Sequence, residues 1–538
     1  MESLKNIFID ESTLKEHINA QNNKYNEYIT HLILLSKKYN VDFSINKKAQ
    51  ILSAAIHRND KGLAKYLLND NKNYDLPVIE KTCSILDSRR LYELMNKKTT
   101  IIKNNKKLMI HKSIMSNLKK MYEDEHISLT SSKCKFIKKN WIQNIDKNDL
   151  EYNIIQFNPD MWKKIIDLLH LKPSDFKLEW FTKYIFEKVY PENSMIAICK
   201  SLNKNNIDDI IKTYKLPYGY LKTHHKNLLD DKVLLTILDY INLNDVIKDW
   251  DSIFNKPVFH NKILERMNNE RLTIPYGELM KRLISFYEAE NINIEISEKL
   301  MKIASDELTN FHSYIEQPVV VFGDASSSMD VAIMTSSIIT SILCSISNAK
   351  LHLFREYDEE INNPPRTVGE VITLGMKCKA SGTTAPVTCL LPYLERKEIV
   401  KTFIIVTDEE ENSDGDCSIS SYGVNGFAQK VKLYRETVYP AKLIFISFLD
   451  ENAKQGKMVS ALKFIIPGID KDIIQFRLSS QRPDLRKLDL LLSKLTINSD
   501  YYNEISNNII NQLKELEFDK INICSTIIDE PDYMEIVI

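Results

Sequence analysis

The chain has 538 residues, of which 43% are hydrophobic and 27% are charged, and its formal net charge is −1. This balance is that of a globular protein with more than one domain, and it excludes disordered and collagen-like chains. The first ten residues carry two acidic side chains, and no apolar run approaches the roughly 20 residues that span a bilayer. We therefore expect a cytoplasmic protein without a membrane segment.

Glycine content and charge both change near residue 316. Only Gly62, Gly219 and Gly277 occur in residues 1–316, and nine glycines follow. Lys and Arg outnumber Asp and Glu by 49 to 42 before this point, and Asp and Glu prevail by 31 to 23 after it. Because glycine avoids helix interiors and favours the loops of α/β folds, we expect a basic helical domain over 1–316 and an acidic domain over 317–538.

Cysteine placement bears on disulfides and zinc. The eight cysteines are scattered and form no CxxC pair. Several lie in apolar stretches, where a reduced cysteine packs as a small hydrophobic residue. We expect neither a disulfide framework nor a zinc site.

Short amphipathic patterns dominate residues 24–310. Apolar residues recur at spacings of three and four, as in Trp162, Ile165, Ile166 and Leu169, or Phe181, Ile185 and Val189. Prolines such as Pro173 and Pro257 stand where one helix would end and the next begin. The rhythm predicts helices of roughly 12 to 18 residues stacked as HEAT-like antiparallel pairs. An irregular all-α domain is the alternative, because no fixed-period repeat is present.

From residue 317 onward, strand-like and helix-like segments alternate, which predicts an open, mostly parallel sheet covered by helices on both faces. The predicted strands are 318–322, 351–354, 403–406, 443–446 and 473–476, and the predicted helices are 331–346, 367–376, 387–394, 427–437 and 485–495. A further helix and a β-prone tail over 521–528 complete the chain.

The first of these strands runs directly into a loop rich in oxygen ligands. Asp324 offers a carboxylate, and Ser326 and Ser328 offer hydroxyls at the second and fourth positions after it. Ligands of open α/β sheets gather outside the carboxyl ends of the strands, and oxygen donors suit a hard cation such as Mg²⁺. We therefore expect Mg²⁺ or another divalent cation here; the alternative is that Asp324 and Asp408 only cap helices.

The D-x-S-x-S spacing resembles the metal-ion-dependent adhesion site of von Willebrand factor A domains. Ser381-Gly382-Thr383-Thr384 resembles the G-G-T loop of that family, with Ser381 in place of a common Gly and Thr384 where Asp is frequent. Thr407-Asp408, after the third long strand, resembles its T-D pair. The resemblance implies that Thr383 and Asp408 complete the ligand set of Asp324, Ser326 and Ser328.

An acidic run follows Asp408, namely Glu409, Glu410, Glu411, Asp414 and Asp416. We expect a solvated surface run, and the alternative is that it raises the local cation concentration. No base lies beside a plausible nucleophile, and there is neither a G-x-S-x-G elbow nor a P-loop. We assign no catalytic residue and expect that the protein is not an enzyme.

Lysine is concentrated in residues 101–140, which contain ten lysines and only three acidic residues. Tyr122, Phe136 and Trp141 lie among or next to these lysines in the sequence. Clustered lysines bind phosphates and aromatic rings stack on unpaired bases, so this segment is a candidate RNA-binding surface. The other interpretation is a soluble helix face over buried aromatic residues. Our candidates are Lys119, Lys120, Lys135, Lys138 and Lys139.

A helical region followed by an A domain resembles the Ro ribonucleoprotein autoantigen (TROVE) family. Leu169-His170-Leu171-Lys172-Pro173 is similar to its S-H-L-K-P segment, Asn269-Glu270-Arg271 and Ile274-Pro275-Tyr276 to its N-E-K and H-P-F segments, and Pro440-Ala441-Lys442-Leu443-Ile444 to its P-A-K-L-I segment. A second family, of plant and large-virus proteins, also joins a helical region to a cytosolic A domain.

The resemblance implies a HEAT-like ring closed by the A domain, which binds small noncoding Y RNAs outside and single-stranded 3′ ends of misfolded RNAs inside. His170 matches an RNA-contacting histidine of the family, whereas the family's neighbouring basic contacts would fall near Asn153 and Phe157 and are therefore missing or displaced in this chain. We expect a monomeric RNA-binding scaffold. The alternative is a cytosolic protein-interaction module that binds a partner carboxylate through the metal.

Overall fold

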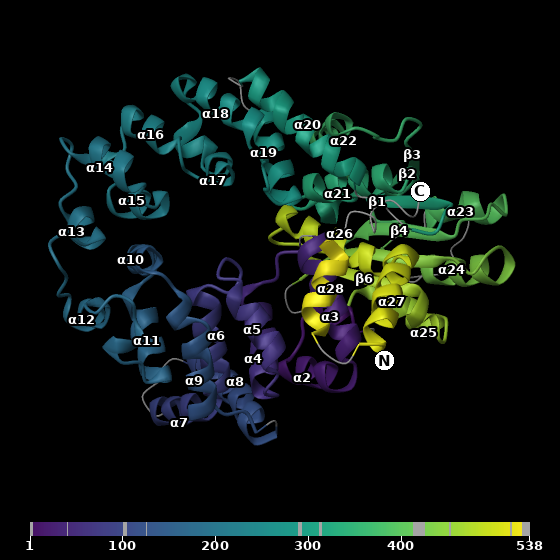
Figure 1. Ribbon diagram of the computed structural model, residues 1–538. Coiled ribbons are helices and arrows are strands. Elements are labelled where there is room, and N and C mark those ends of the chain that lie inside the picture. The colour runs from purple at the N-terminus through teal and green to yellow at the C-terminus, as the bar shows by residue number, and fades with distance from the viewer. Residues whose placement is uncertain are drawn as a thin grey trace. The chain divides into compact units, whose positions relative to one another are not determined.

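The computed structural model describes residues 4–529, except 40, 100–104, 125, 289–292, 311–314, 413–425, 451–452, 454 and 517–518. The chain forms two compact units, which we name unit 1 (residues 1–241 and 504–538) and unit 2 (residues 242–503). Figure 1 shows the helices and strands of each. No helix of the described residues is long and apolar enough to cross a membrane.

Unit 1 is helical over its described residues. Nine of its described α-helices begin at a Ser, Thr, Asp or Asn side chain that accepts an N–H of the first turn, as Ser44, Asp60 and Asp75 do. The helices are α1 (Asn6–Ile9), α2 (Leu14–Asn23), α3 (Tyr25–Ile33), η1 (Leu34–Lys38), α4 (Ile45–His57), α5 (Lys61–Asn69), α6 (Leu76–Leu86), α7 (Ser88–Lys98), α8 (Asn105–Asp124), α9 (Ser131–Asn140), η3 (Ile142–Asn144), α10 (Lys147–Gln156), α11 (Pro159–Leu169), η4 (Pro173–Asp175), α12 (Phe181–Glu187), α13 (Met195–Lys200), α14 (Ile207–Tyr214), α15 (Tyr218–His224), η5 (Lys226–Leu228), α16 (Asp231–Ile237) and α28 (Lys520–Asp529).

Several expectations for this region are corrected. Helices α12 to α16 have six to eight residues, well short of the predicted length. Helix α12 ends at Glu187 because Lys188 adopts a left-handed conformation, so Val189 lies outside the helix and is exposed. The predicted β-prone tail is wrong, because α28 buries Ile521 and Cys524 against α3, η1 and α5.

Unit 2 contains a six-stranded sheet with helices before, between and after its strands. The strands are β1 (Val319–Asp324), β2 (Lys350–Phe354), β3 (Asp358–Glu360), β4 (Thr402–Thr407), β5 (Lys442–Leu449) and β6 (Ile473–Ser479). The helices are α17 (Leu243–Lys248), η6 (Trp250–Phe254), α18 (Pro257–Asn269), α19 (Tyr276–Glu288), α20 (Ile294–Asn310), η7 (Ser327–Met329), α21 (Ile333–Ile346), α22 (Val368–Lys377), α23 (Val387–Glu395), α24 (Gly426–Thr437), α25 (Lys457–Ile465), η9 (Ile469–Asp472), η10 (Leu485–Lys487) and α26 (Leu488–Ile497), and α27 (Asp500–Lys514) begins at the end of this unit.

The strand order is β3-β2-β1-β4-β5-β6, and all neighbouring strands are parallel except the β2–β3 pair. Val320 and Phe322 of β1 face a core shared with α23, α24 and α25, whereas Gly323 faces α21 on the opposite side. Strands β1, β2, β4 and β5 are largely buried on both faces, which explains their continuous apolar sequences.

The predicted fold class, a helical region followed by a mostly parallel α/β sheet, is confirmed. Each of the five predicted strands is present, and β3 and α25 were missed. The compact units divide at residues 241 and 503, so unit 2 combines helices α17–α20 with the sheet. The proposed boundary between residues 316 and 317 separates helical from α/β sequence and stays a prediction.

Candidate metal centre

Asp324 ends β1 at the carboxyl edge of the sheet, where its side chain is 2% exposed. Its Oδ1 accepts hydrogen bonds from the backbone N–H of Ser326 (3.0 Å) and from the Ser326 hydroxyl (2.6 Å), and its Oδ2 accepts from the Thr407 hydroxyl (2.6 Å). The preceding Gly323 allows a close approach to α21, because a Cβ there would lie 2.8 Å from Thr340. The carboxylate is thus held by its own loop and by the end of the neighbouring strand β4.

Ser328 and Asp408 meet Asp324 at the same edge. The hydroxyls of Ser326 and Ser328 lie 3.0 Å apart, and Ser328 hydrogen-bonds to Asp408. Burial raises the pKa of Asp324 well above its usual range, the charge of Asp408 adds to this, and hydrogen bonds from Ser326 and Thr407 oppose it. Burial likewise raises the pKa of Asp408. Two carboxylates that disfavour each other's charge form a site that a divalent cation would stabilise.

The loop of Thr383 is held against the Asp324 loop by two backbone hydrogen bonds. Ser381 N–H donates to the Ala325 carbonyl (2.9 Å), and Ser327 N–H donates to the Gly382 carbonyl (3.1 Å). Gly382 has a φ of +74°, which favours glycine. Thr383 itself is exposed, and its N–H donates to Glu356 Oε2 (3.1 Å).

Thr384, the position after Thr383, is the oxygen donor that our ligand set omitted. Its side chain is buried, and its hydroxyl has no hydrogen-bond partner among the described residues. Its N–H donates to Asn412 Oδ1 (2.8 Å), which joins the Thr383 loop to the segment after β4. A buried hydroxyl without a partner is free to act as an oxygen ligand. The sequence signal was the departure from Asp at this position.

The five candidate ligands therefore lie on three loops that contact one another. The carboxylates of Asp324 and Asp408 and the hydroxyls of Ser326 and Ser328 form one hydrogen-bonded group, and Thr383 lies on the loop that packs beside them. No Lys or Arg of the described residues pairs with either carboxylate. Oxygen donors without a counter-charge are the set that Mg²⁺ prefers.

Glu409 contradicts the expectation of a solvated acidic run. It is buried, and it accepts hydrogen bonds from Ser447 Oγ, from Val459 N–H (3.0 Å) and from Gln475 Nε2 (2.6 Å). Gly456 leaves room for it, because a Cβ there would lie 1.8 Å from Glu409 Oε2. Glu410 pairs with Lys457, whereas Asp414 and Asp416 lie outside the described residues. Glu409 thus anchors the loop that carries Asp408.

The candidate RNA-binding residues lie in unit 1 on α8, α9 and the end of α11. Helix α9 buries Cys134 and Ile137, which leaves Lys135 and Lys139 exposed on another face. Lys119 on α8 is also exposed, and the side chain of Lys120 lies outside the described residues. Lys138 differs from these, because its Nζ pairs with the buried carboxylate of Asp175 at 2.5 Å.

His170 ends α11 in a left-handed conformation and is exposed. The Cys134 thiol donates to the Leu168 carbonyl (3.8 Å), so α9 packs beside this helix end. The acids near this region already have partners, since Asp167 pairs with Arg90 (2.6 Å) and Asp175 with Lys138. The structure therefore brings His170 and the α9 lysines onto neighbouring elements of one unit.

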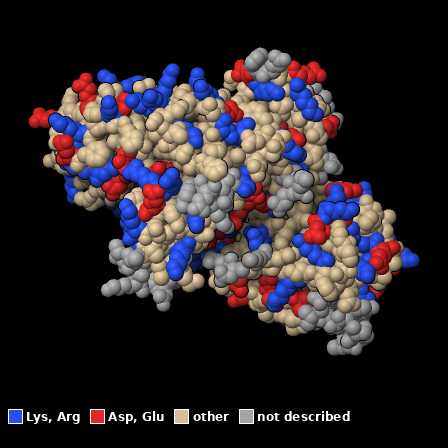
Figure 2. All heavy atoms as spheres, turned by 90° about the horizontal axis from the view of Figure 1, so that it is seen from below, with Lys and Arg blue, Asp and Glu red and all other residues tan. Residues whose placement is uncertain are grey.

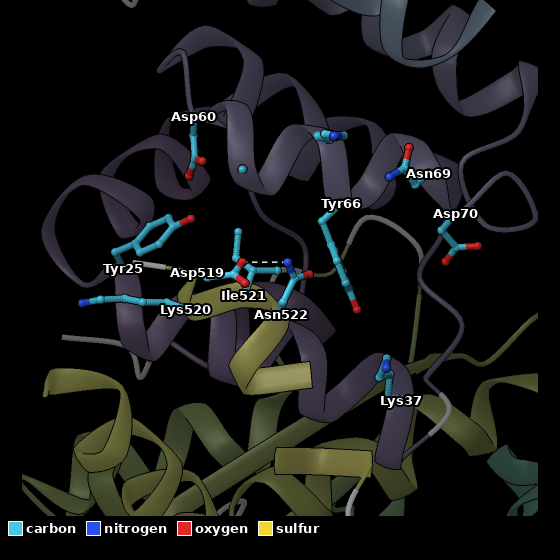
Figure 3. Close-up of a pocket in the computed structure, with 12 residues that line it drawn as sticks. Tyr25, Lys37, Asp60, Tyr66, Asn69, Asp70, Asp519, Lys520, Ile521 and Asn522 are labelled. Atoms are coloured by element: carbon cyan, nitrogen blue, oxygen red, sulfur yellow. Dashed lines mark hydrogen bonds between the residues drawn. The ribbon is translucent and has the colours of Figure 1, made fainter. Parts of the chain in front are cut away.

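Unit 1 also contains a polar pocket, shown in Figure 3. Its volume is about 840 Å³, and it lies between α5 and α28. Lys37, Lys65 and Lys520 line it, but so do Asp60, Asp70 and Asp519. Because the pocket is lined by equal numbers of basic and acidic residues, it has no net positive charge that would attract a polyanion. Figure 2 likewise shows basic and acidic side chains intermixed over one face of the molecule.

Comparisons with known proteins give a likeness to solved structures but none to a family model or a curated sequence. Among solved structures, the Ro (RSR) protein of Deinococcus radiodurans is similar, with 11% identity, a TM-score of 0.49, and coverage of 82% of this chain and 92% of that chain. Ro is the family that the sequence motifs resemble, and at this identity and TM-score the structural likeness defines no shared site residue.

Proposed function

We propose that the protein is an RNA-binding scaffold whose helical unit binds RNA phosphates and whose α/β unit holds a divalent cation, Mg²⁺ first. The observation that carries the RNA part is the exposed face of α9. Lys135 and Lys139 are one helical turn apart and, within the described ranges, neither has an acidic partner within 4 Å. Two uncompensated charges at this spacing suit successive phosphates.

The kind of RNA follows from the family that the sequence resembles. We propose small noncoding RNA of the Y type or misfolded RNA with a single-stranded 3′ end. His170 beside α9 supports this, because an imidazole can stack on an unpaired base next to the phosphates that the lysines bind. Copurification of a discrete small RNA from the native cell, lost after ribonuclease treatment, would identify the ligand.

The Lys135→Glu/Lys139→Glu variant tests the surface. We expect weaker binding to a structured RNA with a single-stranded 3′ tail. The slope of log K against the logarithm of the salt concentration should be smaller in magnitude by about two. Binding is measured by fluorescence anisotropy at several salt concentrations. Lys61→Glu/Lys65→Glu is the matched control, because these exposed lysines on α5 have the same spacing and unit. Equal losses in both variants would contradict an α9 site.

A second function, binding of a protein carboxylate through the metal, is favoured by the surroundings of the cation centre. Val331 and Met334, just beyond the Asp324 loop, are 68% and 38% exposed. Apolar side chains at the rim of a polar site are typical of protein interfaces. Under this alternative, Asp324→Ala would abolish partner binding in ribonuclease-treated extracts and leave RNA binding unchanged.

A further inference from the structure

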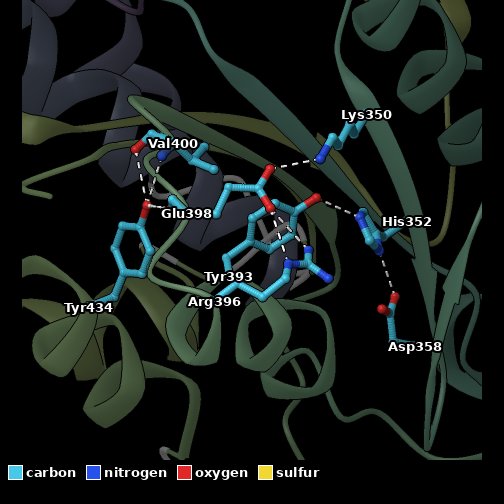
Figure 4. Close-up of polar contacts among 8 residues, drawn as sticks. All are labelled: Lys350, His352, Asp358, Tyr393, Arg396, Glu398, Val400 and Tyr434. Atoms are coloured by element: carbon cyan, nitrogen blue, oxygen red, sulfur yellow. Dashed lines mark hydrogen bonds and ion pairs between the residues drawn. The ribbon is translucent and has the colours of Figure 1, made fainter. Parts of the chain in front are cut away.

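A second group of side chains that could hold a metal ion lies at the β2–β3 edge of the sheet, and Figure 4 shows two of its members, His352 and Asp358. His352 is on β2, Asp358 is the first residue of β3, and Cys389 is on α23. One ligand atom from each lies within 4.8 Å of the others. His352 Nδ1 is 2.8 Å and Cys389 Sγ is 3.1 Å from Asp358 Oδ1.

The group is enclosed. His352 is 1% exposed, Cys389 is 0% exposed and the Asp358 side chain is 20% exposed. Tyr393, also buried, places its hydroxyl 2.7 Å from His352 Nε2, so both ring nitrogens have a fixed neighbour. A histidine whose second nitrogen is held by a polar group is already oriented as metal-bound histidines are.

The charge around Asp358 is unbalanced. The basic residues nearby pair with other carboxylates: Lys350 and Arg396 with Glu398, and Arg355 with Glu359. Among the residues that the structure describes, no Lys or Arg pairs with Asp358, whose Oδ1 faces only an imidazole and a thiol. A largely buried carboxylate without a Lys or Arg partner favours an added cation.

We propose that His352, Asp358 and Cys389 bind one Zn²⁺ ion. Nitrogen, oxygen and sulfur donors from three side chains are the ligands that zinc takes in proteins, and a water molecule at the exposed side of Asp358 would fill the fourth position. The Cys389 thiol proton leaves to solvent, and the His352 proton moves from Nδ1 to Nε2, where it is donated to the Tyr393 oxygen. One Zn²⁺ then balances one thiolate and one carboxylate.

The distances require only a small adjustment. Tetrahedral zinc with bonds of about 2.0 to 2.3 Å needs ligand atoms roughly 3.3 to 3.7 Å apart. The two measured contacts of 2.8 and 3.1 Å therefore widen by less than about 1 Å on binding. The ion would also explain β3, whose sequence Asp-Glu-Glu has low strand propensity and yet pairs with β2.

Cobalt substitution tests this site on the purified full-length chain. Co²⁺ bound by a thiolate gives a sulfur-to-metal charge-transfer absorption in the near ultraviolet, and the Asp324 centre has no sulfur ligand. We expect this band in the wild type and in Asp408→Ala, and its removal by one equivalent of Zn²⁺. We expect no band in Cys389→Ser. Cys344→Ser is the matched control, because Cys344 is buried in the same unit and, among the described residues, its thiol hydrogen-bonds to the Ala349 carbonyl and to Arg366 and not to a metal-binding group.

Two further variants keep the test decisive if Cys389→Ser fails to fold. Asp358→Asn keeps the size of the side chain and should lower the zinc affinity by at least about 100-fold, and Tyr393→Phe, which only removes the outer hydrogen bond, by about tenfold. Native mass spectrometry should count one zinc per wild-type chain. A wild type that shows no charge-transfer band, or a band that persists in Cys389→Ser, overturns the proposal and leaves a hydrogen-bonded core.

Discussion

In unit 2, every carboxylate and serine of the cation centre is held by a neighbour: Asp324 accepts three hydrogen bonds, and Ser328 bridges toward Asp408. In unit 1, Lys135 and Lys139 extend from one exposed helix face with no acidic partner among the described residues. A small hard cation needs fixed oxygen atoms, whereas a flexible polyanion needs only accessible charge. The cation centre is thus distinguished by oxygen ligands that are already held in place, and the lysine face of α9 is distinguished by positive charges that no acidic side chain among the described residues neutralises.

The largest effect that tests this contrast is expected for Asp408→Ala. Loss of one of two carboxylates should weaken Mg²⁺ or Mn²⁺ binding by at least about 100-fold, because the cation then faces a single anionic ligand. Isothermal titration calorimetry measures the affinity. Asp330→Ala is the control, because Asp330 is an exposed carboxylate on the same loop as Asp324. Equal weakening in both variants would mean that diffuse negative charge, not the fixed site, binds the ion.

The pH dependence of stability gives an intermediate effect. Since burial raises the pKa of Asp324 and of Asp408, the folded metal-free chain binds more protons than the unfolded chain above about pH 4. Their contribution to the free energy of unfolding should therefore fall as the pH rises from about 4 until both are ionised. Asp324→Asn should raise the stability at pH 8 by at least about 1.4 kcal/mol, as measured by denaturant unfolding in chelator.

Mg²⁺ should reverse this destabilisation in the wild type and have little effect on Asp324→Asn. Asp330→Asn provides the baseline for removing an exposed charge. If the wild type and Asp324→Asn show parallel pH profiles, the two carboxylates do not interact as their geometry indicates.

The smallest effect is expected for Gly382→Ala, which strains the loop of Thr383. A Cβ at position 382 would lie 1.8 Å from Glu356 Oε2, and the alanine would have to adopt the φ of +74° that Gly382 has. We expect a loss of about 1 to 2 kcal/mol in unfolding free energy and a several-fold weaker Mg²⁺ affinity. Gly468→Ala isolates the backbone strain, because Gly468 has a φ of +84° and open space around its Cβ position. A metal affinity lowered equally in both variants would contradict a role for this loop.

The arrangement of the loops around Asp324 could be predicted from the sequence more fully than the helical unit. The order strand, Asp324, Ser326 and Ser328 is local, the resemblance to A domains added Asp408, and parallel strands bring their carboxyl ends together, in agreement with the contacts between these loops. Thr384 and Glu409 were not identified, because burial of a polar side chain depends on contacts with Asn412, Ser447 and Gln475 from other segments.

Three further features depend on contacts between distant segments, which the sequence does not reveal. Lys138 has the same sequence context as Lys135 and Lys139, but its pairing with Asp175 of η4 depends on how α9 packs. The His352, Asp358 and Cys389 group has no motif spacing, since its members come from two strands and a helix. The apolar residues of α28 fit either a strand or a helix, and packing against α3 and α5 selects the helix.

The docking of α28 has a consequence during synthesis. Its side chains Ile521 and Cys524 are buried in unit 1, whose other described helices come from residues 1–241 and from α27. Lys520 Nζ donates a hydrogen bond to Asn26 Oδ1 of α3 (3.2 Å). The ribosome adds about 5 to 20 residues per second, so the 450 residues between α5 and α28 take roughly 20 to 90 s to make. Throughout that interval the faces of α3 and α5 that α28 covers remain open to chaperones, so the first part of the chain to emerge is among the last to be completed.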